Sequence, residues 1–182
     1  MKASYGDTGL SNGSGAFGNA LTLAEGPLDL TWHHASTTAE FLGEFYAIRG
    51  PALSLDINDA RHSIGYLVNE LLENAVKFRH PGDITIVSSI ENKRFEIKVS
   101  NLVSRETAER FSALLEEITS RDPGELLIER IEANAMDETS SASGLGLLTL
   151  MSDYGAQLGW EFHDDGGGPA VRLNTYAALT LS

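Results

Sequence analysis

The sequence predicts an α+β fold in which one layer of helices packs on a mixed, mostly antiparallel sheet. Strand-like segments with alternating apolar side chains occur as neighbouring pairs, and segments of helical periodicity are grouped between these pairs. The chain has 182 residues, 42% of them hydrophobic. This length suffices for one hydrophobic core and is short for two separate domains. We therefore expect a single two-layer sandwich.

The first part of the chain shows little periodicity. Residues 1–26 are rich in Gly, Ser and Asn, so we predict a flexible tail there and place the folded domain at 27–182. The domain should open with an edge strand at 28–32. A helix is expected next at 37–48, capped by Ser36.

The longest predicted helix begins at Asp56 and stops at His80-Pro81-Gly82. Its apolar residues recur at about 100° per residue and share one stripe, formed by Ile64, Leu67, Val68, Leu71, Ala75 and Phe78. Glu70, Asn74 and Lys77 follow at steps of four and three residues and form a second stripe beside the first. A carboxylate, a carboxamide and an amine in this order can hold a metal–phosphate group, or they can form an ordinary solvated face.

The rest of the chain reads as a hairpin, two helices, a loop, a short helix and two strands. The hairpin strands are expected at 83–90 and 94–100, and the two helices at 104–120 and 123–134. The loop is expected at 135–143, the short helix at 147–154 and the last two strands at 158–163 and 171–181.

Two further segments are candidates for ligand binding. The sequence Gly144-Leu145-Gly146-Leu147 leads into a predicted helix, whose first amides and dipole favour a phosphate, although many Gly-x-Gly loops simply turn a corner. Asn101 stands where the second hairpin strand is predicted to end. It is either a turn former or a hydrogen-bonding partner for the edge of a base.

Composition limits the classes of partner. Acidic residues outnumber basic ones 26 to 13, and the formal charge of −13 repels phosphate backbones, so no nucleic acid is expected as a partner. Cys is absent, which excludes a disulfide frame, a thiol nucleophile and a thiolate metal site. The first residues lack the apolar segment of a signal peptide and no run of about eighteen apolar residues occurs. We expect no membrane contact and a cytoplasmic location.

Taken together, these segments resemble the GHKL superfamily, which comprises gyrase, heat-shock chaperone, histidine-kinase and mismatch-repair ATPases. Residues 69–78, NELLENAVKF, are similar to its N-box, and Gly144-Leu145-Gly146-Leu147 is similar to its G-box. The resemblance spans about residues 55–180. It implies a Bergerat-type fold that binds ATP and Mg²⁺ between the sheet, the N-box helix and a lid at about 104–143.

The resemblance also implies roles by position. Asn74 would bind Mg²⁺, Glu70 would be the general base and Lys77 would lie beside the phosphates. The amides around Gly144, Leu145, Gly146 and Leu147 would hold the phosphates.

One departure concerns the base. The family usually has an Asp-x-Gly-x-Gly motif whose Asp contacts the adenine amino group. Asn101 stands in that place here and both glycines are missing. A neutral carboxamide is a weaker acceptor than a carboxylate, so ATP affinity and adenine preference stay open.

The chain looks most like stand-alone regulators of the anti-sigma-factor kinase type. Such a protein would transfer the γ-phosphate of ATP to a Ser or Thr of a partner protein in bacterial signal transduction by partner switching, and a homodimer is compatible with it. His62 is not expected to be a phosphoacceptor in cis, because it lies roughly 18 Å from Asn74 along the same predicted helix. The alternative is a catalytically inactive, nucleotide-sensing interaction module, which the missing glycines favour and the retention of Glu70 and Asn74 disfavours.

Overall fold

The computed structural model describes residues 2–10, 17–25, 30–49, 55–136, 144–164 and 168–182. Its strands are β1 (Lys2–Gly6), β2 (Phe17–Leu23), β3 (Ile84–Glu91), β4 (Arg94–Ser104), β5 (Gln157–His163) and β6 (Ala170–Thr180). Its helices are α1 (Trp32–Ala47), α3 (Ile57–Lys77), α4 (Arg105–Ser120), α5 (Pro123–Met136) and α6 (Leu145–Ser152).

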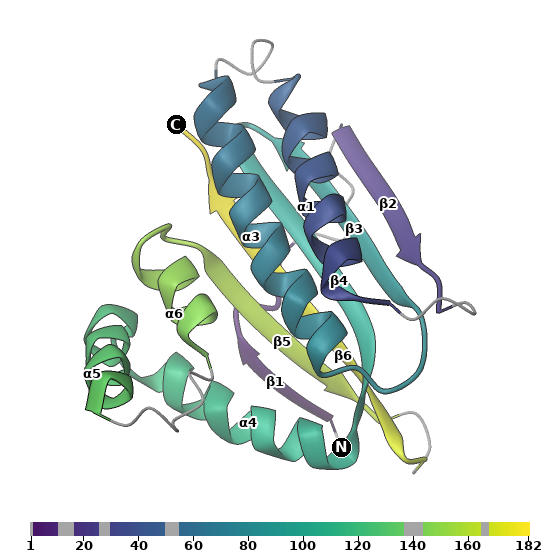
Figure 1. Ribbon diagram of the computed structural model, residues 1–182, viewed down its shortest axis with the longest axis vertical. Coiled ribbons are helices and arrows are strands. Elements are labelled where there is room, and N and C mark those ends of the chain that lie inside the picture. Colours follow the sequence, from purple (N-terminus) through teal and green to yellow (C-terminus); the bar gives the residue numbers. More distant parts are fainter. Residues whose placement is uncertain (1, 11–16, 26–29, 50–54, 137–143, 165–167) are drawn as a thin grey trace.

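The strands form one six-stranded sheet in the order β1-β5-β6-β4-β3-β2, and α1 and α3 lie side by side across one of its faces (Figure 1). Each pair of neighbouring strands is antiparallel. The predicted two-layer α+β fold is confirmed, with a fully antiparallel rather than a mixed sheet. None of the helices in the described part of the chain has the length and hydropathy that a membrane span requires.

The predicted long helix is present as α3. Its N-cap is Asp56, whose carboxylate accepts hydrogen bonds from the amides of Asn58 and Asp59 at 2.9 and 2.8 Å. The apolar stripe is buried except for Phe78, which ends the helix and is exposed. The helix ends at Lys77, three residues before the predicted end, because the amide of His80 already bonds to the carbonyl of Leu102 in β4 at 2.7 Å.

From α3 onward, every predicted helix and strand is present with ends shifted by a few residues. The long strands β4 and β6 pair over their whole lengths, so that Phe95 faces Leu179 and Val103 faces Val171. The helix-facing side of the sheet forms the core, where Trp160 and Phe162 of β5 are fully buried. In the predicted loop at 135–143, the first two residues are still helical and 137–143 lie outside the described residues.

The predicted flexible tail at 1–26 is wrong for the residues that are described. Strand β1 pairs with β5 and strand β2 pairs with β3, so the two occupy opposite edges of the sheet and belong to the folded domain. After β1 the chain reaches the sheet face opposite the helices, where Leu10 is buried against Tyr176 and Ala178. The sequence gives little sign of this because short edge strands are held by pairing rather than by a buried apolar face.

The predicted edge strand at 28–32 is also wrong. Residues 28 and 29 lie outside the described residues, Leu30 is buried, and α1 begins at Trp32, before its predicted start. The N-cap is Thr31 rather than Ser36. Its backbone amide donates to Nδ1 of His34 at 3.0 Å, so a histidine takes the place that Glu or Gln usually has in a capping box.

Candidate functional site

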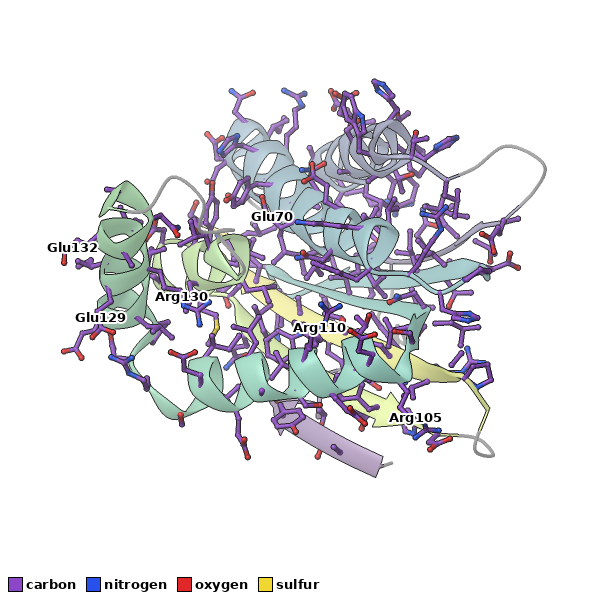
Figure 2. All side chains as sticks on the ribbon, turned by 60° about the horizontal axis from the view of Figure 1, so that its bottom comes forward. Glu70, Arg105, Arg110, Glu129, Arg130 and Glu132 are labelled. Atoms are coloured by element: carbon purple, nitrogen blue, oxygen red, sulfur yellow. The ribbon has the colours of Figure 1, made fainter. Side chains whose placement is uncertain are left out.

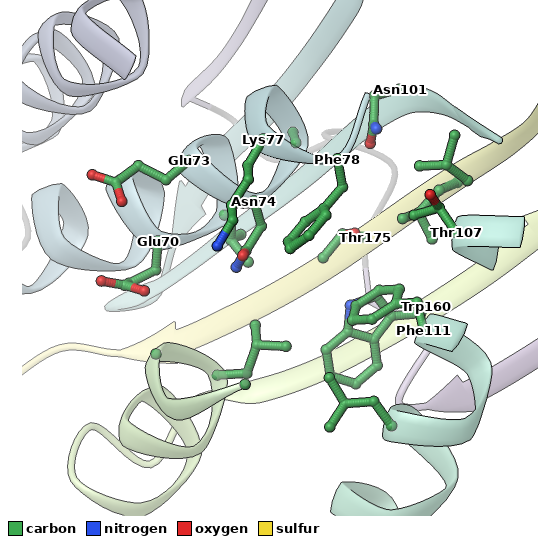
Figure 3. Close-up of a pocket in the computed structure, with 18 of the residues that line it drawn as sticks. Glu70, Glu73, Asn74, Lys77, Phe78, Asn101, Thr107, Phe111, Trp160 and Thr175 are labelled. Atoms are coloured by element: carbon green, nitrogen blue, oxygen red, sulfur yellow. The ribbon is translucent and has the colours of Figure 1, made fainter. Parts of the chain in front are cut away.

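A cavity of about 660 Å³ lies between α3, α4, the start of α6 and the central strands (Figure 3). It brings together three segments that are far apart in the sequence. Of the eight predicted site residues, those that line this cavity are Glu70, Asn74, Lys77, Asn101, Gly144, Gly146 and Leu147. Leu145 is half-buried and does not line it.

The edge of α3 supplies the polar side of the cavity. Figure 3 shows the head groups of Asn74 and Lys77 close together and directed inward, with Glu70 one turn earlier pointing toward the start of α6. Asn74 is half-buried and Lys77 is exposed. Glu73 turns away from these groups and accepts a hydrogen bond from Asn69 at 2.8 Å.

The Glu70 carboxylate lies directly against Gly146. A Cβ atom at Gly146 would lie 2.8 Å from Cδ of Glu70 and closer still to Oε2, so any side chain at this position would displace the carboxylate. Burial raises the pKa of Glu70, and the neighbouring Glu73 raises it further. A carboxylate with a raised pKa at the wall of a cavity is a candidate proton acceptor.

The start of α6 has the geometry of a phosphate cradle. Gly144 is its N-cap and has φ of +88°, a conformation that side chains rarely adopt. The amides of the first turn have no intrahelical acceptor, so they are free to donate to an anion. Arg130 of α5 lies beside this turn, because a Cβ atom at Gly144 would be 2.9 Å from its Nη1, and it forms an ion pair with Glu117 of α4 at 2.7 Å.

Asn101 lies inside β4 and not at the end of a strand. It faces Leu173 of β6, is only 3% exposed, and its Nδ2 donates to the carbonyl of Leu102 at 3.3 Å. The strand continues to Ser104, whose hydroxyl caps α4 by accepting from the amide of Thr107 at 3.1 Å. The strand therefore passes straight into α4, and the turn expected after residue 100 is absent from this described segment because β6 pairs with β4 throughout.

Several lining residues were not predicted from the sequence. They come from the end of α3, from α4 and from the sheet, and are Phe78, Thr107, Arg110, Phe111, Trp160 and Thr175. Figure 2 shows Arg110 on the α4 side of this space, opposite Glu70. Phe78 was part of the predicted apolar stripe. No local pattern marks the other five, because the packing of α4 against the sheet, and not their spacing, brings them to the cavity.

The lining suits a ligand with a flat apolar part and an anionic part. Phe111 contacts the buried Trp160 edge to face, with ring centroids 6.2 Å apart, so one end of the cavity is aromatic. The other end is charged: the amine of Lys77 lies beside Asn74 on α3, and Arg110 of α4 lies across the cavity from the carboxylate of Glu70.

The donor set fits a magnesium ion that arrives with a polyphosphate. The described residues contain no group of three or more His, Cys, Asp or Glu side chains that could hold a metal ion by themselves. A hard cation here would take a carboxamide oxygen from Asn74 and complete its shell with phosphate oxygens and water.

Comparisons with known proteins show a similarity of fold. No protein-family model matches the sequence, and no similar sequence is found among curated proteins. The fold is similar to that of a chain in the crystal structure of the SiaB–SiaC complex from Pseudomonas aeruginosa, with a TM-score of 0.62 and 16% sequence identity. The similarity covers 87% of this chain and 89% of that chain. At this level of identity the likeness concerns the fold.

Proposed function

We propose that this chain binds ATP with Mg²⁺ in the cavity and transfers the γ-phosphate to a Ser or Thr of a partner protein. The observation that carries the proposal is the meeting of Glu70, Asn74 and Lys77 with the Gly144–Leu147 turn around one cavity. The predicted resemblance to the GHKL superfamily rests on the same residues. Two segments that are far apart in the sequence and converge in space are a stronger sign than either motif alone.

Each residue has a role that follows from its chemistry. The Asn74 carboxamide oxygen would hold Mg²⁺, and the ion would supply neutralisation of the phosphate charge. Lys77 and Arg110 attract the phosphate oxygens, and the first amides of α6 hold them. Glu70 would take the proton of the partner's Ser or Thr hydroxyl while the hydroxyl oxygen bonds to the γ-phosphorus. The bond between the γ-phosphorus and the oxygen that bridges it to the β-phosphate would break, and ADP would leave.

Two observations support a protein as the acceptor. The formal charge of −13 disfavours a nucleic acid as the direct partner. The similar fold occurs in a complex of two proteins, SiaB and SiaC. On this proposal the chain acts as a signalling regulator that binds and modifies a partner protein.

A second candidate is a module that binds nucleotide without turnover. Asn101 favours it, because one N–H of its side chain is already bonded to the carbonyl of Leu102 and its oxygen is a neutral acceptor, weaker than a carboxylate toward a base. The direct passage of β4 into α4 favours it too, since a helix stands where the family it resembles has a glycine-containing motif.

Calorimetry with ATP and MgCl₂ tests both candidates. Asn74→Ala should weaken Mg-dependent binding at least about a hundredfold, because a metal ligand is lost while alanine preserves the helix. Asn69→Ala is the matched control: it removes an Asn from the same helix that bonds to Glu73 and does not line the cavity. If both variants bind like the wild type, Asn74 has no part in the site.

Phosphotransfer separates the two candidates. The wild type is incubated with labelled ATP, Mg²⁺ and the products of neighbouring genes, alongside Glu70→Gln. The kinase proposal expects label on one partner with the wild type and none with Glu70→Gln, although both bind ATP. Binding without transfer to any candidate partner would favour the inactive module, and absence of nucleotide binding would contradict both.

A further inference from the structure

A cation that the mechanism above does not use stands beside the phosphate cradle. Arg130 of α5 has its guanidinium against Gly144, the N-cap of α6, because a Cβ atom at Gly144 would lie 2.9 Å from Nη1. That Cβ is one C–C bond from Cα, so Nη1 lies within about 4.5 Å of the Gly144 Cα atom. The Arg130 side chain is 20% exposed and points from α5 toward α4 and α6, whereas Glu129 and Glu132 project outward (Figure 2). A partly buried cation therefore lies next to the amides that would hold a phosphate.

Glu117 of α4 binds this cation in its present position. Its Oε2 accepts a hydrogen bond from Nη2 of Arg130 at 2.7 Å. Arg130 does not line the cavity, whereas Gly144 and the neighbouring Leu114 do. A phosphate on the first turn of α6 would be a second acceptor for the same guanidinium, and a polyphosphate carries more negative charge than one carboxylate. The arginine fork suits both acceptors, because it can donate two parallel N–H bonds to a carboxylate or to a phosphate.

We propose that Arg130 is a phosphate-binding residue that Glu117 restrains, so that bound nucleotide and Glu117 compete for one guanidinium. This inference rests on the proposed function, because it takes the first turn of α6 as the phosphate site. The formal charge of −13 and the carboxylates of Glu70 and Glu73 at the cavity repel a triphosphate. A further cation beside the cradle, in addition to those of the lining, offsets part of this repulsion.

The competition would connect the ligand to the contact between α4 and α5. The ion pair of Arg130 with Glu117 joins these two helices, so a nucleotide that takes the guanidinium weakens the contact. By linkage, loss of the ion pair then strengthens nucleotide binding by the same factor. A second ion pair serves for comparison: Arg121, which follows α4, pairs with Glu129 of α5 at 2.6 Å and lies 3.8 Å from Glu117. No atom of Arg121 is among the nearest neighbours of a Cβ at Gly144.

Calorimetry of the full chain with Mg-ATP tests the competition through the signs of two changes. Arg130→Met keeps an apolar stem without the charge and should weaken binding at least about tenfold, because charge-assisted hydrogen bonds to the phosphate are lost. Glu117→Gln should tighten binding about two- to fivefold, because it releases the guanidinium from a partly exposed ion pair. An ion pair that only joined the two helices would give both variants the same sign, since each of them breaks the same contact.

The double variant Glu117→Gln/Arg130→Met separates release of the arginine from a general change in charge. It should bind Mg-ATP like Arg130→Met, because no guanidinium is left to release, whereas a long-range effect of the lost carboxylate would persist. The matched controls are Glu129→Gln and Arg121→Met, which make the same changes in the neighbouring ion pair. At physiological salt, both should bind within about twofold of the wild type.

The inference is overturned if Arg130→Met binds like the wild type, if Glu117→Gln fails to tighten binding, or if the tightening persists in the double variant. In each of these cases, Mg-ATP binding by the wild type leaves the proposed nucleotide site in place. A wild type that binds no Mg-ATP overturns the proposed function and this inference together. Circular dichroism checks that Arg130→Met is folded, and the gain expected for Glu117→Gln cannot arise from loss of folded protein.

Discussion

Replacing Gly146 with alanine should leave the fold intact and displace the carboxylate of Glu70. The added Cβ would lie 2.8 Å from Cδ of Glu70, where ordinary carbon contacts need about 3.5 Å or more, so the side chain must move away. Such a rotation costs about 0.5–1.5 kcal/mol, and the better helix propensity of alanine returns up to about 1 kcal/mol. The free energy of unfolding should therefore fall by about 1.5 kcal/mol at most and can be unchanged.

The measurement is the pKa of Glu70, followed by NMR of its carboxyl carbon. Burial raises this pKa in the wild type, so a displaced, better hydrated carboxylate should titrate closer to its ordinary range. Phosphotransfer should fall in the same variant while Mg-ATP binding persists. Denaturant titration checks that stability is unchanged.

Gly144→Ala is the contrasting control, because this glycine is required for its backbone. Its φ is +88° and a Cβ would lie 2.9 Å from Nη1 of Arg130, so alanine should cost about 1–2 kcal/mol of stability. If Gly146→Ala leaves the pKa of Glu70 unchanged, or destabilises as much as Gly144→Ala, the contact between Glu70 and Gly146 does not exist in solution.

Stability should also respond to pH and to the N-terminal strands. The raised pKa of Glu70 makes its contribution to stability fully present below its ordinary pKa. This contribution is lost as pH rises through the folded value, so Glu70→Gln should remove the decline in a series of urea titrations that begins below that ordinary pKa and goes upward. Burial and the hydrogen bond to Glu161 raise the pKa of Tyr176 to about 12, so its phenol should ionise late in an absorbance titration, with stability falling as pH rises through that range. Tyr176→Phe removes the 2.6 Å hydrogen bond to Glu161 and should cost about 1.5–3 kcal/mol in denaturant titrations. A chain that starts at residue 27 lacks both edge strands, and its thermal transition followed by circular dichroism should be strongly lowered or absent.

The elements that could be predicted are marked by residues within their own segments of the sequence. Asp56 caps α3 through its own side chain, and the buried stripe of that helix repeats at helical spacing, so both are visible in the sequence. The strands β3 and β4 are joined by a tight turn and alternate in burial. The candidate site followed from two motifs and Asn101, and seven of the eight residues selected line one cavity.

The parts that could not be predicted depend on distant partners. Strand β1 is held by β5, and β2 presents mostly exposed side chains, so neither shows a pattern of its own. Asn101 looks like the end of a strand until β6 is placed beside β4 and extends the pairing to Ser104. Arg110 and Phe111 reach the cavity through the path of α4, which no spacing in the sequence specifies.

The placement of β1 has a consequence for how the protein is made. A ribosome releases β1 early, yet the partner of this strand is β5, where Lys2 lies opposite His163. Strand β1 therefore has no strand to pair with until nearly all of the sheet has been synthesised. Its brevity and polar composition, KASYG, suit that wait because they give it little tendency to aggregate. Closure of this edge is therefore expected to be a late step in forming the sheet, after β5 has been synthesised.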